Sequence, residues 1–129
     1  MAQYPQGIFQ SLDWLLKKVK ILALNKQPVY NIGTLAAGST YTMPGRGIYY
    51  GVSSNGSTSI LQFPDPALCT GQTIVVINTG STNGFAVSAT YQPRSNPNNS
   101  GLGVIGSSTQ GIFISNGVNW YAVGGISGI

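Results

Sequence analysis

The stretch Gly111–Tyr121 reads GIFISNGVNWY and carries the clearest fold signal in the chain. Its central dipeptide, Asn116-Gly117, readily accepts the positive φ angles of a tight type I′ turn. Short apolar runs flank this turn on both sides, as expected for two antiparallel strands. We therefore predict a structural β-hairpin with a two-residue loop, in which Phe113 faces Trp120 as an aromatic cross-strand pair.

Short apolar runs separated by turn residues extend from Val29 to the end of the chain. Two further Asn-Gly dipeptides predict turns, and the Pro- and Asn-rich stretch Gln92–Gly101 predicts a long exposed loop. We predict nine strands, over Val29–Gly33, Thr40–Met43, Gly47–Val52, Ser59–Phe63, Gln72–Asn78, Phe85–Thr90, Gly103–Ile105, Gly111–Ser115 and Val118–Val123. Short strands at this spacing are typical of a β-sandwich or jelly-roll-like domain, which we assign to residues 28–129.

The N-terminal segment has a different pattern. Within residues 8–24, apolar side chains recur at alternating intervals of four and three, which is the heptad stripe of a coiled-coil-like α-helix. The stripe and its flank comprise Ile8, Leu12, Leu15, Leu16, Val19 and Leu22. We assign residues 1–27 to a helical segment for oligomerisation or anchoring. Two other uses of the helix stay open, namely packing on its own β domain and binding at a membrane surface.

Charge is scarce, with 6 Lys+Arg, 2 Asp+Glu and no His among 129 residues. Most general acid–base chemistry therefore lacks its usual side chains, and we predict that the chain is not an enzyme. A single cysteine without imidazole excludes the ordinary zinc ligand sets, so we expect neither a metal nor a cofactor. Four of the basic residues are lysines within the first 26 positions. They offer few phosphate contacts, and we expect no nucleic-acid partner.

Three local features have structural explanations. The GxGxxG string at residues 101–106 opens no predicted helix and precedes no acidic residue, so it does not indicate a dinucleotide site. Cys69 has no base near it in the sequence and is expected to be a buried, inert thiol. Asp65 lies between two prolines and is expected to cap a turn.

Targeting signals are not evident. The N-terminus lacks the basic-then-apolar layout of a secretory signal, and no apolar run approaches the roughly 20 residues of a membrane span. We therefore expect synthesis in the cytoplasm, no signal peptide and no transmembrane segment.

Tyrosines are the candidate binding residues. Tyr49, Tyr50 and Tyr91 lie among Gly, Ser and Asn with few charges, and Arg94 follows shortly after Tyr91. Such surfaces stack on sugars and donate hydrogen bonds to them, as the Tyr- and Ser-rich loops of antibodies do with their ligands. Tyrosines also fill the edges of β-sandwiches, so receptor binding and core packing are equally compatible with the sequence.

Two segments resemble a known family. Gly71–Asn78 (GQTIVVIN), followed by the hairpin segment Gly111–Tyr121, is similar to the trimeric β domains of bacteriophage tail and head fibres. Asn116 stands where that family usually has Asp, and Val118 where it has Thr; both keep the turn chemistry. The N-terminal stretch Phe9–Lys20 is also similar to the start of fibre-like phage proteins. The resemblance implies a homotrimer with an N-terminal attachment region and a distal β domain, but it transfers no receptor-binding residue.

The sequence therefore favours a virion structural protein, either a homotrimeric fibre or a capsid spike. We expect it to be made in the host cytoplasm and located in the virion, where its N-terminal helix anchors or trimerises it on a capsid or tail protein. Its β domain would project outward toward a host-surface glycan or protein. The alternative is a small carbohydrate-binding or adhesin-like module of cellular origin.

Overall fold

The computed structural model describes residues 27–95 and 100–124. Half of these residues are in strands and three form a 3-10 helix. The strands are β1 Val29–Leu35, β2 Thr40–Thr42, β3 Gly47–Ser53, β4 Ile60–Gln62, β5 Thr73–Asn78, β6 Phe85–Val87, β7 Arg94–Ser95, β8 Ser100–Gly101, β9 Val104–Ile105, β10 Thr109–Ser115 and β11 Trp120–Gly124. The 3-10 helix η1, Pro66–Leu68, lies between β4 and β5.

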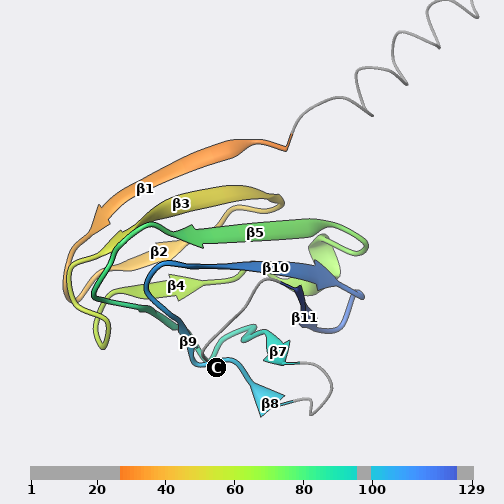
Figure 1. Cartoon of the computed structure of the whole chain (residues 1–129). Coiled ribbons are helices and arrows are strands. Elements are labelled where there is room, and N and C mark those ends of the chain that lie inside the picture. Colours follow the sequence, from red (N-terminus) through yellow and green to blue (C-terminus); the bar gives the residue numbers. More distant parts are fainter. Residues whose placement is uncertain (1–26, 96–99, 125–129) are drawn as a thin grey trace, which may run out of the picture.

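The strands form two sheets that face each other across the molecule (Figure 1). Sheet A has the order β1-β3-β5-β10-β11-β7-β8, and sheet B has the order β2-β4-β6-β9. The first six strands alternate between the two sheets, and their pairings within each sheet are parallel. The chain thus winds through three stacked coils, β1–β2, β3–β4 and β5–β6. Strand β10 then returns antiparallel to β5, and β11 runs antiparallel to β10.

The coils differ in length. Ile48 pairs with Val29, which precedes it by 19 residues, whereas Val75 pairs with Ile48, which precedes it by 27 residues. The longer coil contains η1, whose start is capped by Asp65 because its Oδ1 accepts a hydrogen bond from the backbone N–H of Ala67 at 2.9 Å. Asp65 is thus a turn residue, as predicted.

A single hydrophobic core fills the space between the sheets. Inward-pointing side chains alternate with outward-pointing ones along each strand, as the two-residue repeat of a strand dictates. The core includes Tyr49, Ile74, Val76 and Phe113 from sheet A and Leu61, Phe85 and Val87 from sheet B, with Phe63 beyond the end of β4. Complete burial of one such side chain contributes about 1.5–3 kcal/mol, so this layer is the main source of stability.

The predicted fold class, an α-helix followed by a jelly roll or β-sandwich, is wrong. The described residues are mainly β, and their only helix is the short 3-10 helix η1. A jelly roll is built from antiparallel strands, whereas the first six strands here pair in parallel. Apolar alternation predicts a strand and its buried face, but it does not reveal the direction of the neighbouring strand.

The predicted helix has no counterpart in the described residues. Residues 8–24, over which it was expected, lie outside them. So do the candidate oligomerisation residues Ile8, Leu12, Leu15, Leu16, Val19 and Leu22.

The hairpin of Gly111–Tyr121 forms with a longer loop than the sequence predicts. Phe113 pairs with Ala122 and not with Trp120, and the loop spans residues 116–119. The side chain of Asn116 explains this loop, because its Oδ1 accepts two backbone N–H groups within it, at 2.9 and 2.8 Å. An asparagine that closes a wider loop in this way replaces the tight turn.

Candidate functional site

A pocket of about 330 Å³ lies beside β7, β8 and the loop between β10 and β11. Its walls are formed by Pro66, Ala89, Tyr91, Gln92, Arg94, Gly101, Val118, Asn119 and Trp120. Two of the four candidate receptor-binding residues, Tyr91 and Arg94, therefore share one pocket. They reach it from the connection between β6 and β7 and from β7 itself.

The backbone around Tyr91 is held in an uncommon conformation. Its φ of 56° lies in the left-handed region, which residues other than glycine rarely adopt, and its side chain is 44% exposed. The next residue is fixed by its side chain, since Gln92 Nε2 donates a hydrogen bond to the carbonyl of Leu102 at 3.0 Å. The carboxamide of Gln92 lies against Gly101, where it occupies the space that a Cβ atom would take.

The opposite wall of the pocket, formed by the β10–β11 hairpin, is hydrogen-bonded to the segment that contains η1. Trp120 Nε1 donates to the carbonyl of Pro64 at 2.8 Å, and Ser115 Oγ donates to the carbonyl of Pro66 at 2.7 Å. Trp120 is fully buried, so it supports the wall and leaves Asn119, on the loop, to face the pocket. Both hydrogen bonds satisfy buried or partly buried groups, which makes this wall rigid.

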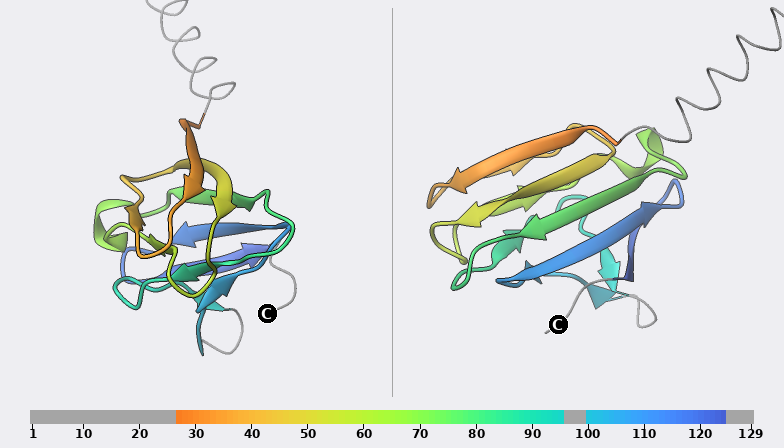
Figure 2. Two further views of the ribbon diagram at one scale, coloured as in Figure 1. Left: turned by 90° about the vertical axis from the view of Figure 1, so that its left-hand side faces the viewer. Right: turned by 45° about the horizontal axis from the view of Figure 1, so that its top comes forward.

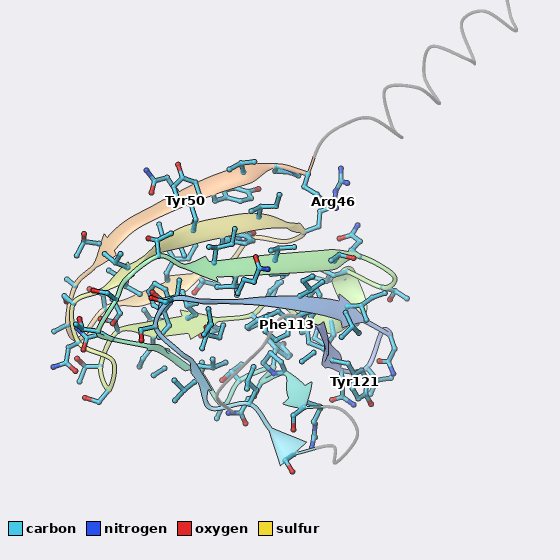
Figure 3. The ribbon with its side chains drawn as sticks, in the orientation of Figure 1. Arg46, Tyr50, Phe113 and Tyr121 are labelled. Carbon is cyan, nitrogen blue, oxygen red and sulfur yellow. The ribbon has the colours of Figure 1, made fainter. Side chains whose placement is uncertain are left out.

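Phe63 links Phe113 and Trp120, the two rings predicted to pair directly. Its ring centroid lies 4.8 Å from that of Phe113 and 5.8 Å from that of Trp120. Phe113 points inward from β10, beneath the ribbon of sheet A (Figure 3). The aromatic contact of the hairpin is thus made through a third ring, at the inclined geometries that such rings favour.

Tyr49 is a core residue and not part of a receptor site. Its side chain is fully buried, its ring stacks on Tyr30 with centroids 4.6 Å apart, and its hydroxyl donates to the carbonyl of Gly45 at 2.5 Å. Burial raises the pKa of Tyr49 to about 12, because the phenolate would lose its hydration.

Tyr50 lies on the opposite face of β3 from Tyr49. It is 37% exposed and projects from the outside of sheet A (Figure 3). The sheet order places three strands (β5, β10 and β11) between β3 and β7, so Tyr50 stands about 19 Å from the strand that carries Arg94. The structure therefore does not bring Tyr50 to the pocket.

The outside of sheet A is largely apolar over three adjacent strands, with Thr73 and Gln110 as polar residues on the same side. We define the outer face by Ile48 and Tyr50 on β3, Val75 and Ile77 on β5, and Ile112 and Ile114 on β10. Ile48, Val75 and Ile112 are cross-strand partners and form one row, and Tyr50 pairs with Ile77 in the next. The sequence predicted these strands, but which of their faces stays uncovered depends on where sheet B lies.

The remaining groups that could take part in catalysis or metal binding are buried or far from one another. Burial raises the pKa of the Cys69 thiol, and Asp65 adds a smaller effect in the same direction. Among residues 27–95 and 100–124, no group of three His, Cys, Asp or Glu side chains could hold a metal ion. Within the same residues, no helix is long and apolar enough to cross a membrane.

Comparison with known proteins yields no match among family profiles, curated proteins or solved structures.

Proposed function

We propose that this chain is a structural protein of a virion, a homotrimeric fibre or capsid spike whose β domain projects toward the host surface. It would be made in the host cytoplasm, and residues 1–27 would attach it to a capsid or tail protein. In this proposal the chain is not an enzyme, and the pocket serves recognition.

One observation carries the proposal. The two segments that resemble phage fibre domains, Gly71–Asn78 and Gly111–Tyr121, are direct neighbours in sheet A. Val75 pairs with Ile112, and Ile74 pairs with Phe113. Segments far apart in the sequence that resemble one family are expected to lie together if they form that family's structural unit. Their adjacency therefore supports the resemblance.

The distribution of charge is consistent with an assembled subunit. The described residues contain three charged side chains, Arg46, Asp65 and Arg94. A surface with so few charges gains little from hydration and suits contact with other copies or with neutral host molecules.

The location of the protein tests the proposal. An antibody against the β domain, applied to intact particles of a virus that carries this gene, is expected to label fibres or spikes in electron micrographs. Particles that contain the protein only in their interior, or that lack it, would contradict the proposal. Sedimentation equilibrium of the purified full chain is expected to give a trimer.

The pocket favours a second function, that of a carbohydrate-binding or adhesin-like module. Tyr91 and Asn119 offer the aromatic and amide groups that recognise sugars, and Arg94 adds positive charge suited to an acidic glycan. This function is compatible with a fibre tip or with a cellular protein.

Glycan binding is tested with two alanine variants. Tyr91→Ala is expected to lower binding on a glycan array at least tenfold, because it removes the exposed ring from the pocket wall. Val104→Ala truncates an exposed side chain on β9 of sheet B, outside both the pocket and the outer face, and is expected to leave glycan binding unchanged. Equal losses in both variants, or an array without hits, would exclude the pocket as a sugar site.

A further inference from the structure

We infer that the outer face of sheet A is the surface through which copies of this chain associate, as a trimer around a threefold axis. Figure 2, right, looks onto strands β1, β3, β5 and β10 lying side by side, with sheet B behind them. No described element covers this side of the sheet. Tyr50 and Ile114 are each 37% exposed, and Val29, the β1 residue that pairs with Ile48, is 62% exposed. The number of copies rests on the proposed function, whereas the face itself rests on the geometry.

The six side chains that define the face are uncharged. Of the three charged residues described, Arg46 lies two residues before Ile48 and borders one end of the face, Asp65 caps η1, and Arg94 lies on β7, toward the far edge of sheet A. A symmetry axis brings identical residues of neighbouring copies close together, so a charged face would place like charges opposite one another. The centre of this face has no such repulsion, and it offers a charged partner nothing to pair with. A second copy is therefore the occupant that its chemistry fits.

The edge of sheet A is less suited to association than its face. Strand β1 has a register shift between Asn31 and Gly33, where Asn31 Oδ1 accepts the backbone N–H of Gly33 at 2.8 Å. Irregularities of this kind bend an edge strand and discourage another strand from pairing with it. The edge strand of sheet B, β2, has three residues and offers little backbone to pair.

The face is too small to hold two copies together strongly. The three strands that define it, spaced about 4.8 Å apart and about 20 Å long, present roughly 300 Å² per copy. A single pair of such faces therefore sums to about 600 Å², the size of weak or crystal-packing contacts. Three flat apolar faces can close around one axis and leave none exposed.

The test compares identical substitutions on two sheets. Val75→Asp places a carboxylate at the centre of the outer face, and Val104→Asp places one on β9 of sheet B, where Val104 is 50% exposed. Both are made in the full chain and studied by sedimentation equilibrium, with circular dichroism as a check on folding. We expect the wild type and Val104→Asp to be trimers. Val75→Asp is expected to be a folded monomer whose association constant is at least a hundredfold lower.

A second variant protects the test against misfolding. Tyr50→Lys changes a side chain that is already partly in solvent, so it leaves the core intact and should also dissociate the trimer. A wild-type trimer that survives both Val75→Asp and Tyr50→Lys would overturn the assignment of this face and leave the proposed function standing. A wild-type monomer would overturn both. If deletion of residues 1–26 turned a monomer into an oligomer, the occupant would be the chain's own N-terminal segment, and the inference would be wrong.

Discussion

Adjacent tyrosines on β3 show how far position in a strand decides the role of a residue. Tyr49 and Tyr50 have the same chemistry, but Tyr49 stacks in the core and Tyr50 lies on the outer face. In a strand with one covered face, alternation buries only one of two neighbours, so the sequence could predict that the pair divides. It could not predict which tyrosine is buried, because Tyr50 shares its side of β3 with the apolar Ile48 and Val52, and yet the side of Tyr49 faces the core.

The buried hydroxyl of Tyr49 makes stability depend on alkaline pH. Its pKa is raised from 10.0 to about 12, so between these values the unfolded chain has lost a proton that the folded chain retains. The free energy of unfolding therefore falls as pH rises through this range, by at most about 1.4 kcal/mol per pH unit from this group. Tyr49→Phe should flatten this slope, and at neutral pH it should cost about 1 kcal/mol for the lost hydrogen bond to Gly45.

Urea unfolding at a series of alkaline pH values measures this slope. Gly51→Ala is the control, because its added methyl group lowers stability without removing an ionisable group, and it should keep the wild-type slope. If Tyr49→Phe and the wild type lost stability in parallel above pH 10, the burial of this hydroxyl would not be the cause.

At the scale of elements, the close approach of the paired strands β1 and β3 depends on Gly51. A Cβ atom added at Gly51 would lie 2.6 Å from the carbonyl oxygen of Gly33 and 2.8 Å from Cβ of Ile32. Backbone atoms cannot move away cheaply, so Gly51→Ala should separate the first two coils and destabilise the fold by about 1–3 kcal/mol. Thermal or urea unfolding measures the loss. Gly45→Ala adds the same methyl group in open space and should change stability by less than about 0.5 kcal/mol; equal effects of the two would contradict this account.

The sequence located most strands but not their arrangement. The predicted ranges Gly47–Val52 and Gln72–Asn78 differ by one residue from β3 and β5, because apolar alternation and flanking glycines mark strand limits directly. The parallel coils were missed because they differ in length, 19 against 27 residues, so no repeat appears in the sequence. The predicted jelly roll followed from the usual pairing of short strands, which these long-range contacts override.

The candidate pocket was predictable only in part. Tyr91 and Arg94 are close in sequence, and their shared loop region made them joint candidates. Asn119 and Trp120 join them because the β10–β11 hairpin is fastened to the η1 segment through Trp120 and Ser115. These hydrogen bonds connect residues 49 and 56 positions apart, a distance at which local sequence patterns carry no information.

At the scale of the whole molecule, the way association responds to salt distinguishes the outer face from the N-terminal segment. If copies join through the outer face, no ion pair is broken on dissociation, and the association constant should stay nearly constant from low to high sodium chloride. Ammonium sulfate should strengthen it, since this salt favours burial of apolar surface. If the cluster of Lys17, Lys18, Lys20 and Lys26 instead governs association, the constant should change steeply as salt screens these charges. Sedimentation equilibrium of the full chain across a salt series measures this difference in the association constant. In a separate measurement, a thermal unfolding midpoint that rises with protein concentration would show that association and folding are linked. A steep salt dependence would assign association to the basic N-terminal segment and contradict the role inferred for sheet A.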